Sequence, residues 1–191
     1  MEKFKHKSVF RRGAEDGLGF GIYLSALFIF SAIATNMPLL GLIATIMALV
    51  VPVYTYLTLR KGFVQNGYFY TFSEVWTHGI VLFLCGSMIM AATIVVYMTW
   101  INPNFLYEQC QSAIATYRHI GGAMGNEIAS TLELMLKGNM LPSPLSIAGN
   151  TISFGVFSGS ILSLILTPII RHFRPRVKDD DDDDNNQINQ I

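Results

Sequence analysis

Long apolar segments separated by short polar ones dominate this chain. Four of the segments contain no charged residue, and each is close to the roughly 20 residues that a helix needs to cross a bilayer. Lipid offers no water to satisfy backbone hydrogen bonds, so such segments are expected to be helical. The pattern predicts an all-α integral membrane protein with four transmembrane helices. The predicted spans are residues 17–37, 39–59, 79–101 and 147–170.

The longest connection between spans, residues 102–146, has a helical pattern of its own. Gly121-Gly122 divides it, and a second helix is expected to begin near Asn126. Before the glycines, apolar residues recur at helical spacing, at Leu106, Cys110, Ala113, Ile114 and Tyr117. We therefore expect an external helical hairpin between spans three and four, which either caps the bundle or lies on the outer leaflet.

The positions of lysine and arginine predict the orientation of the chain. Five lie in the N-terminal segment 1–16, two in the link between spans two and three, and four after residue 170. The opposite loops hold only Arg118 and Lys137. By the positive-inside rule, both termini are expected in the cytoplasm. The predicted organisation is a basic cytoplasmic N-terminus (1–16), a membrane domain (17–170) and a cytoplasmic C-terminal segment (171–191).

Composition supports a membrane protein. The chain is 51% hydrophobic and only 14% charged, against about 25% charged residues in soluble domains. Its 13 basic and 13 acidic residues balance only because six acids form one run, Asp179 to Asp184. Such a block of like charges is expected to be a disordered tail. The composition argues against a disordered protein or a disulfide-stapled secreted domain.

Small residues repeat every four positions in the first and last spans. This spacing creates a flat helix face that another backbone can approach closely. It predicts helix contact either between spans one and four of one molecule or between two copies. The predicted helix-packing residues are Gly17, Gly21, Ser25, Gly155, Gly159 and Ser163.

The segment before span three carries a candidate polar site. Glu74 and His78 are four residues apart, so they would share a helix face at the cytoplasmic end of the span. They could accept protons as a pair, or face the lipid headgroups. The same segment, 60–78, is rich in aromatic residues, which are typical of a membrane-interface anchor. A docking surface for a cytoplasmic partner is the alternative.

Recognisable catalytic patterns are missing from the sequence. The four histidines are scattered without metal-binding spacing, and no Gly-x-Ser-x-Gly turn or glycine-rich phosphate loop occurs. Cys85 lies within span three and Cys110 outside it, so the two thiols are not expected to pair. We therefore predict no catalytic, cofactor-binding or metal-binding residues, no enzyme activity and no nucleic-acid partner.

Two motifs give the chain a family resemblance. They are "YTFSEVWTHG" before span three and "INPNFLYEQ" at Ile101 to Gln109. With the basic N-terminus and close first hairpin, the chain resembles a domain-of-unknown-function family of bacterial four-helix inner-membrane proteins. The resemblance covers roughly Lys7 to Arg174. It implies the topology and a bacterial inner membrane, and no activity.

The sequence thus favours a non-enzymatic interaction protein or accessory subunit of the bacterial inner membrane. Its expected partners are the lipid bilayer and either another membrane protein or a second copy. The alternative is a small oligomeric transporter or channel. That alternative predicts a polar lumen, lined by Asn150, Thr151, Ser153 and His78.

Overall fold

The computed structural model describes residues 8–34, 37–65 and 70–172. Within these residues the chain is helical and contains no strand. The predictions for the first seven residues, for Tyr68 and Phe69, and for the acidic tail fall outside the described residues. The elements are α1 (Val9–Ile33), α2 (Pro38–Gln65), α3 (Phe72–Val96), the π-helical turn η1 (Tyr97–Ile101), α4 (Phe105–Ile120), α5 (Gly122–Lys137) and α6 (Pro144–His172).

In the described part of the chain, four helices are long and apolar enough to cross a membrane: α1, α2, α3 with η1, and α6. The predicted all-helical class and the four spanning segments are thereby confirmed. The helices extend beyond the apolar segments, since α1 begins at Val9 and α3 at Phe72. In α1 the polar extension is stabilised by an ion pair between Arg11 Nε and Glu15 Oε1 at 3.1 Å, one helical turn apart.

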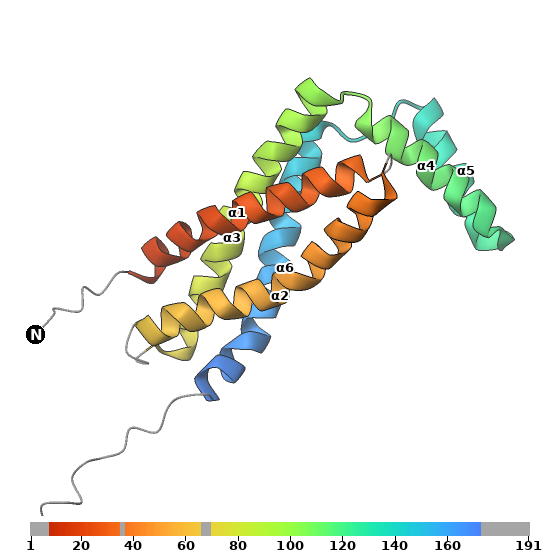
Figure 1. Cartoon of the computed structure of the whole chain (residues 1–191). Coiled ribbons are helices and arrows are strands. Elements are labelled where there is room, and N and C mark those ends of the chain that lie inside the picture. Colours follow the sequence, from red (N-terminus) through yellow and green to blue (C-terminus); the bar gives the residue numbers. More distant parts are fainter. Residues whose placement is uncertain (1–7, 35–36, 66–69, 173–191) are drawn as a thin grey trace, which may run out of the picture.

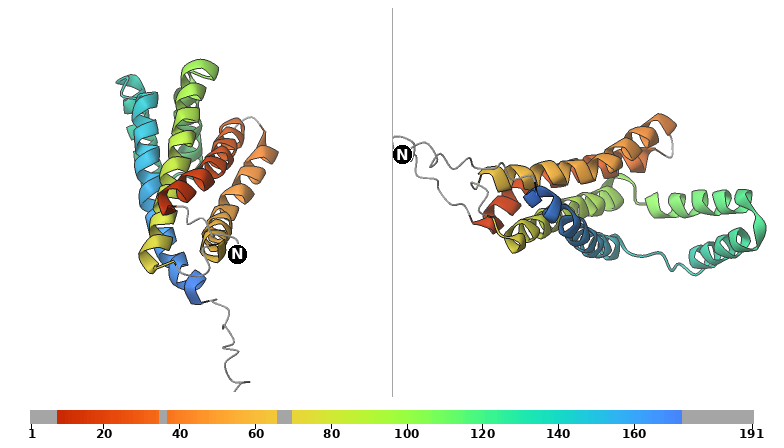
Figure 2. Two further views of the ribbon diagram at one scale, coloured as in Figure 1. Left: turned by 90° about the vertical axis from the view of Figure 1, so that its left-hand side faces the viewer. Right: turned by 90° about the horizontal axis from the view of Figure 1, so that it is seen from below.

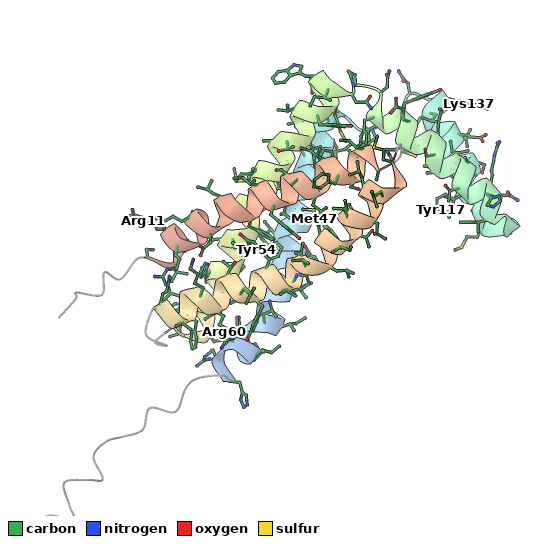
Figure 3. All side chains as sticks on the ribbon, in the orientation of Figure 1. Arg11, Met47, Tyr54, Arg60, Tyr117 and Lys137 are labelled. Carbon is green, nitrogen blue, oxygen red and sulfur yellow. The ribbon has the colours of Figure 1, made fainter. Side chains whose placement is uncertain are left out.

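Helix α3 is the centre of the bundle. It makes extensive contacts with α1 and with α6, while α2 lies mainly against α1 (Figures 1 and 2). Tyr23 Oη donates to the carbonyl of Met47 at 2.6 Å, and the ring of Phe20 stacks on Tyr54 at 5.4 Å (Figure 3). The rest of α2 exposes large apolar side chains, as expected for a helix facing lipid.

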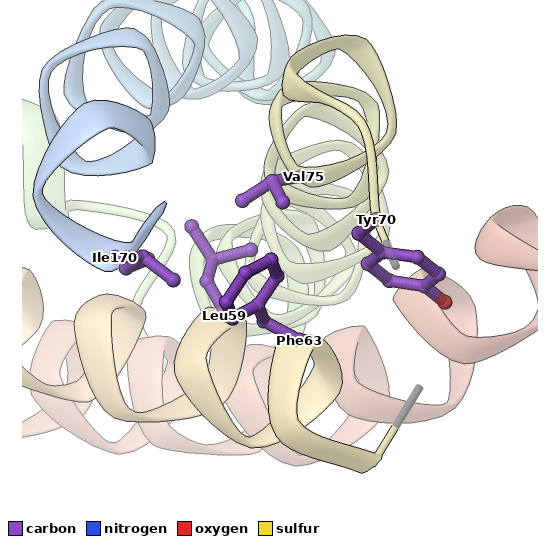
Figure 4. Close-up of a cluster of buried hydrophobic side chains, with 5 residues drawn as sticks. All are labelled: Leu59, Phe63, Tyr70, Val75 and Ile170. Carbon is purple, nitrogen blue, oxygen red and sulfur yellow. The ribbon is translucent and has the colours of Figure 1, made fainter. Parts of the chain in front are cut away.

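We call the end of the bundle where α1 begins and α6 ends the proximal end. A buried cluster closes it, formed by Leu59, Phe63, Tyr70, Val75 and Ile170 (Figure 4). Phe63 and Tyr70 belong to the aromatic segment that was predicted to anchor the chain at the membrane interface. Both are buried, because α2, α3 and α6 converge on them, so for these two rings the interface interpretation is wrong.

At the opposite, distal end, α4 and α5 form a pair that lies crosswise to α3 and α6 (Figures 1 and 2). Gly121 separates the two helices, and α5 begins at Gly122, four residues before the start expected near Asn126. Their φ values of 68° and 77° lie in a backbone region that favours glycine. Before α4, Asn102 Oδ1 accepts a hydrogen bond from the Asn104 backbone N–H at 3.1 Å, and the helix begins at Phe105.

Candidate functional site

The two residues of the predicted polar site have separate roles. Glu74 is the third residue of α3, and its Oε2 accepts from the Thr71 backbone N–H at 2.7 Å and from the Thr71 hydroxyl at 2.9 Å. The Glu74 backbone N–H donates to the Thr71 hydroxyl in return. This reciprocal pattern is a capping box. Glu74 therefore holds the start of α3 and does not bond to His78.

His78 instead reaches across to α1. Its Nε2 lies 3.0 Å from Asp16 Oδ2, and the imidazole is completely buried, while about a third of the Asp16 side chain (29%) is exposed. His78 does not face the lipid headgroups, because α1 and α2 cover it. The contact therefore links a buried side chain of α3 to a partly exposed carboxylate of α1.

Arg12 completes a polar cluster at the proximal end, which we call the proximal polar cluster: Arg12, Asp16, Gly62, Tyr70 and His78. Arg12 Nη1 donates to the carbonyl of Gly62 at 2.8 Å, and its guanidinium carbon lies 6.0 Å from the centre of the Tyr70 ring. The cluster thus ties α1 to α2 and to α3.

Gly62 is required by the close approach of the His78 ring. A Cβ at this position would lie 2.8 Å from His78 Cε1 and 2.9 Å from Nδ1. Among the described residues, neither His78 Nδ1 nor Tyr70 Oη has a hydrogen-bond partner, although both are buried. Buried polar atoms are normally paired, so these two atoms make the proximal polar cluster the candidate site.

The predicted helix-packing residues all lie against α3. A Cβ on Gly17 would approach Cys85 to 2.6 Å, and one on Gly21 would approach Ile89 to 2.6 Å. Further along α1, Ser25 Oγ accepts a hydrogen bond from Thr93 Oγ1 at 2.9 Å.

The small residues of α6 meet another side of α3. A Cβ on Gly155 would approach Ser87 to 2.7 Å, and one on Gly159 would approach the Phe83 ring to 2.1 Å. Ser163 occupies the space that Gly79 leaves open. The expectation that span one packs on span four was wrong. Both flat faces are used within one molecule, but α3 is the partner of each, because it offers Gly79, Gly86, Ser87 and Ala91 to its neighbours.

The residues proposed to line a transport lumen do not come together. Thr151 and Ser153 donate to carbonyls of their own helix, at Ile147 and Gly149. Asn150 lies thirteen residues before Ser163 in α6, about 20 Å along the helix axis at 1.5 Å per residue. His78 is at the level of Ser163, since Gly79 contacts that residue. Asn150, Thr151 and Ser153 therefore lie toward the opposite end of the bundle from His78.

Within the described residues, Cys85 and Cys110 form no disulfide with each other. No three His, Cys, Asp or Glu side chains within residues 8–34, 37–65 and 70–172 lie close enough together to hold a metal ion.

A family model described as "Protein of unknown function (DUF4199)" matches residues 15–172. The chain belongs to the DUF4199 family. The match begins next to Asp16 and ends with α6, so the DUF4199 domain contains all four spans and the α4–α5 pair. The resemblance to a family of unknown function is thereby confirmed. No match was found among curated proteins or among solved structures.

Proposed function

We propose that this DUF4199 protein is a non-enzymatic interaction protein, acting as an accessory subunit in the bacterial inner membrane. The proposal rests on the arrangement of the α4–α5 pair. Its two helices make their main contacts with each other and project from the distal end of the bundle. The flat faces of α1 and α6 are already occupied by α3, whereas the pair has its main contacts within itself and is left for a partner.

The α4–α5 pair offers a groove that suits a polar protein surface. The groove has a volume of about 350 Å³ and is lined by Gln111, Ile114, Ala115, Arg118, Glu133 and Leu136. Arg118 and Glu133 form an ion pair across it. Polar and charged groups at the rim of a groove with apolar residues at its base are typical of a protein–protein contact.

The orientation is part of the proposal: both termini are cytoplasmic, and the α4–α5 pair is on the outer side. In support, the proximal end of the bundle carries a group of basic residues, namely Arg11, Arg12, Arg60, Lys61 and Arg171. The positive-inside rule assigns such an end to the cytoplasm.

Extraction from native membranes into nanodiscs, followed by affinity capture and quantitative mass spectrometry, tests the accessory role. We expect a second protein in stoichiometric amount. Ala115→Trp, which fills the groove, should lower its recovery several-fold. Ser112→Trp is the matched control, because it places the same side chain on an exposed part of α4 outside the groove. Recovery of the chain alone, or as a homo-oligomer, would contradict the proposal.

An oligomeric transporter or channel is the second candidate. One observation favours it: the contact of the buried His78 with the partly exposed Asp16, since ionisable groups inside a membrane bundle often serve ion pathways. Flux through liposomes that contain the purified protein should then exceed flux through empty liposomes, and Asp16→Asn should abolish the excess. Equal flux in the two preparations would exclude this candidate.

A further inference from the structure

The α4–α5 pair has two unlike faces. In α4, Leu106, Cys110 and Tyr117 recur at helical spacing on one side, and in α5 the matching residues are Met124, Ile128 and Leu132. We call these six residues the apolar face of the pair. None of them lines the groove that contains the Arg118–Glu133 ion pair, because the groove opens on the other side.

Most charged residues of the two helices lie away from the apolar face, and Glu127, three residues after Met124, lies at its edge. Successive residues of a helix are turned by about 100°. In α4 this rotation places Arg118 and Glu108 away from the line of Leu106, Cys110 and Tyr117. In α5, Glu133 and Lys137 likewise fall on the side opposite Met124 and Ile128. Tyr117 and Lys137, labelled in Figure 3, mark the two faces. Side by side, α4 and α5 therefore form one amphipathic unit, with the apolar face on one side and the charged groove on the other.

The apolar face is turned toward the spans. Leu106, at its base, packs on the buried cluster of the distal end together with Ile147 of α6. Farther out along the pair, the bundle no longer covers this face. Met124, near the tip, is 76% exposed. The face is thus continuous with the core at one end and uncovered at the other.

Short connections keep the pair at the level where the spans end. Only residues 102–104 separate η1 from α4, and residues 138–143 separate α5 from α6. Trp100 and Ile101, at the last turn of the third span, are 77% and 68% exposed. An exposed tryptophan at the end of a span is typical of the boundary between lipid and water. The pair begins a few residues beyond that boundary and lies crosswise to the spans (Figure 1).

We infer that the apolar face of the α4–α5 pair rests on the lipid bilayer that the spans cross, buried among the headgroups and upper acyl chains. Amphipathic helices with one charged and one apolar face bind membrane surfaces in this way. The charges of α4 and α5 nearly balance, with Glu108, Glu127 and Glu133 against Arg118 and Lys137. Docking is therefore driven by apolar contact and requires no anionic lipid. It also leaves the groove on the opposite face open to water.

Fluorescent labelling of single cysteines tests this inference. In a Cys85→Ala background, native Cys110 carries an environment-sensitive nitrobenzoxadiazole label on the apolar face. The matched control carries the label at Ala115→Cys, with Cys110→Ser, on the groove face. A second pair, Met124→Cys and Ser130→Cys, repeats the comparison on α5. Each full-length variant is reconstituted in phosphatidylcholine vesicles with and without doxyl-labelled phosphatidylcholine.

Labels at Cys110 and Met124→Cys should show blue-shifted emission and several-fold more quenching by doxyl lipid than labels at Ala115→Cys and Ser130→Cys. Adding salt or anionic lipid should leave this contrast unchanged. Labels on both faces that behave as in water would overturn the inference. Labels on the apolar face that are shielded from water but not quenched by doxyl lipid would also overturn the inference, because a second copy of the chain would then cover the face. The vesicles contain no other protein, so the result is independent of whether capture finds a partner.

Discussion

Phe83 of α3 fills the space that Gly159 leaves on α6. A Cβ at position 159 would lie 2.1 Å from Cγ of the Phe83 ring, and Gly159 is itself buried. On α1 the roles are reversed, since the ring of Phe20 enters the space beside Gly86 of α3. Helix association in lipid depends on such close van der Waals contact, because lipid tails provide no hydrophobic drive between helices.

Replacing Gly159 should therefore destabilise the bundle. Gly159→Ala forces the Phe83 ring or the α6 backbone to move, and overpacking of this kind costs about 1–3 kcal/mol. The measurement is unfolding by sodium dodecyl sulfate in mixed micelles, followed by circular dichroism. Gly149→Ala is the matched control in the same helix, where no atom lies within 4 Å of an added Cβ. A Gly159→Ala variant as stable as Gly149→Ala would contradict this packing.

The sequence predicted where helices touch more reliably than which helices touch. The four-residue spacing of Gly17, Gly21 and Ser25 identified a contact face, because that spacing is a local property of one helix. The partner depends on how the other helices share the available space. Nothing in the spacing indicated that α3 would have small residues on two sides.

The same limit applies to the candidate polar site. Glu74 and His78 are neighbours on one helix, which local spacing predicts, yet each bonds elsewhere. Asp16 is separated from His78 by 62 positions, so only the packing of α1 on α3 brings them together. A usable signal was present in Asp16 itself, an acid at the edge of an apolar segment. Spacing alone does not single Asp16 out, because an acid four residues after Arg12 also fits ordinary pairing on a helix surface.

Glu74 should behave as a helix cap and not as a proton acceptor. Glu74→Gln retains an oxygen that can accept from Thr71, and glutamine is a normal member of the capping box. We expect its unfolding midpoint to match that of the unmodified protein. Thr71→Ala removes the hydroxyl that the Glu74 backbone bonds, which costs about 1 kcal/mol. If Glu74→Gln is as damaging as Thr71→Ala, the carboxylate charge has a role beyond capping.

The Asp16–His78 contact should appear as a coupling between the effects of the two substitutions on the free energy of unfolding. A double-mutant cycle with Asp16→Ala and His78→Ala separates the pair's interaction from the cavity that loss of the imidazole leaves. Residues in direct contact couple by about 0.5–3 kcal/mol, and we expect the lower half of this range because Asp16 is partly exposed.

Arg11 and Glu15 provide the control cycle. Their side chains are 71% and 45% exposed, and surface pairs one helical turn apart contribute about 0.3–0.5 kcal/mol. Equal coupling in the two cycles would mean that burial of His78 adds nothing to its contact with Asp16.

The proposed orientation predicts which cysteines an impermeant reagent can reach. With Cys85→Ala and Cys110→Ser as background, Lys61→Cys reports the proximal end and Ala115→Cys reports the groove face of α4. Both positions are exposed. A membrane-impermeant maleimide added to intact spheroplasts should label Ala115→Cys at once and Lys61→Cys only after permeabilisation. Labelling in detergent corrects for differences in thiol reactivity. The opposite order would contradict the proposed orientation. It would place the arginine-rich proximal end outside, against the positive-inside rule.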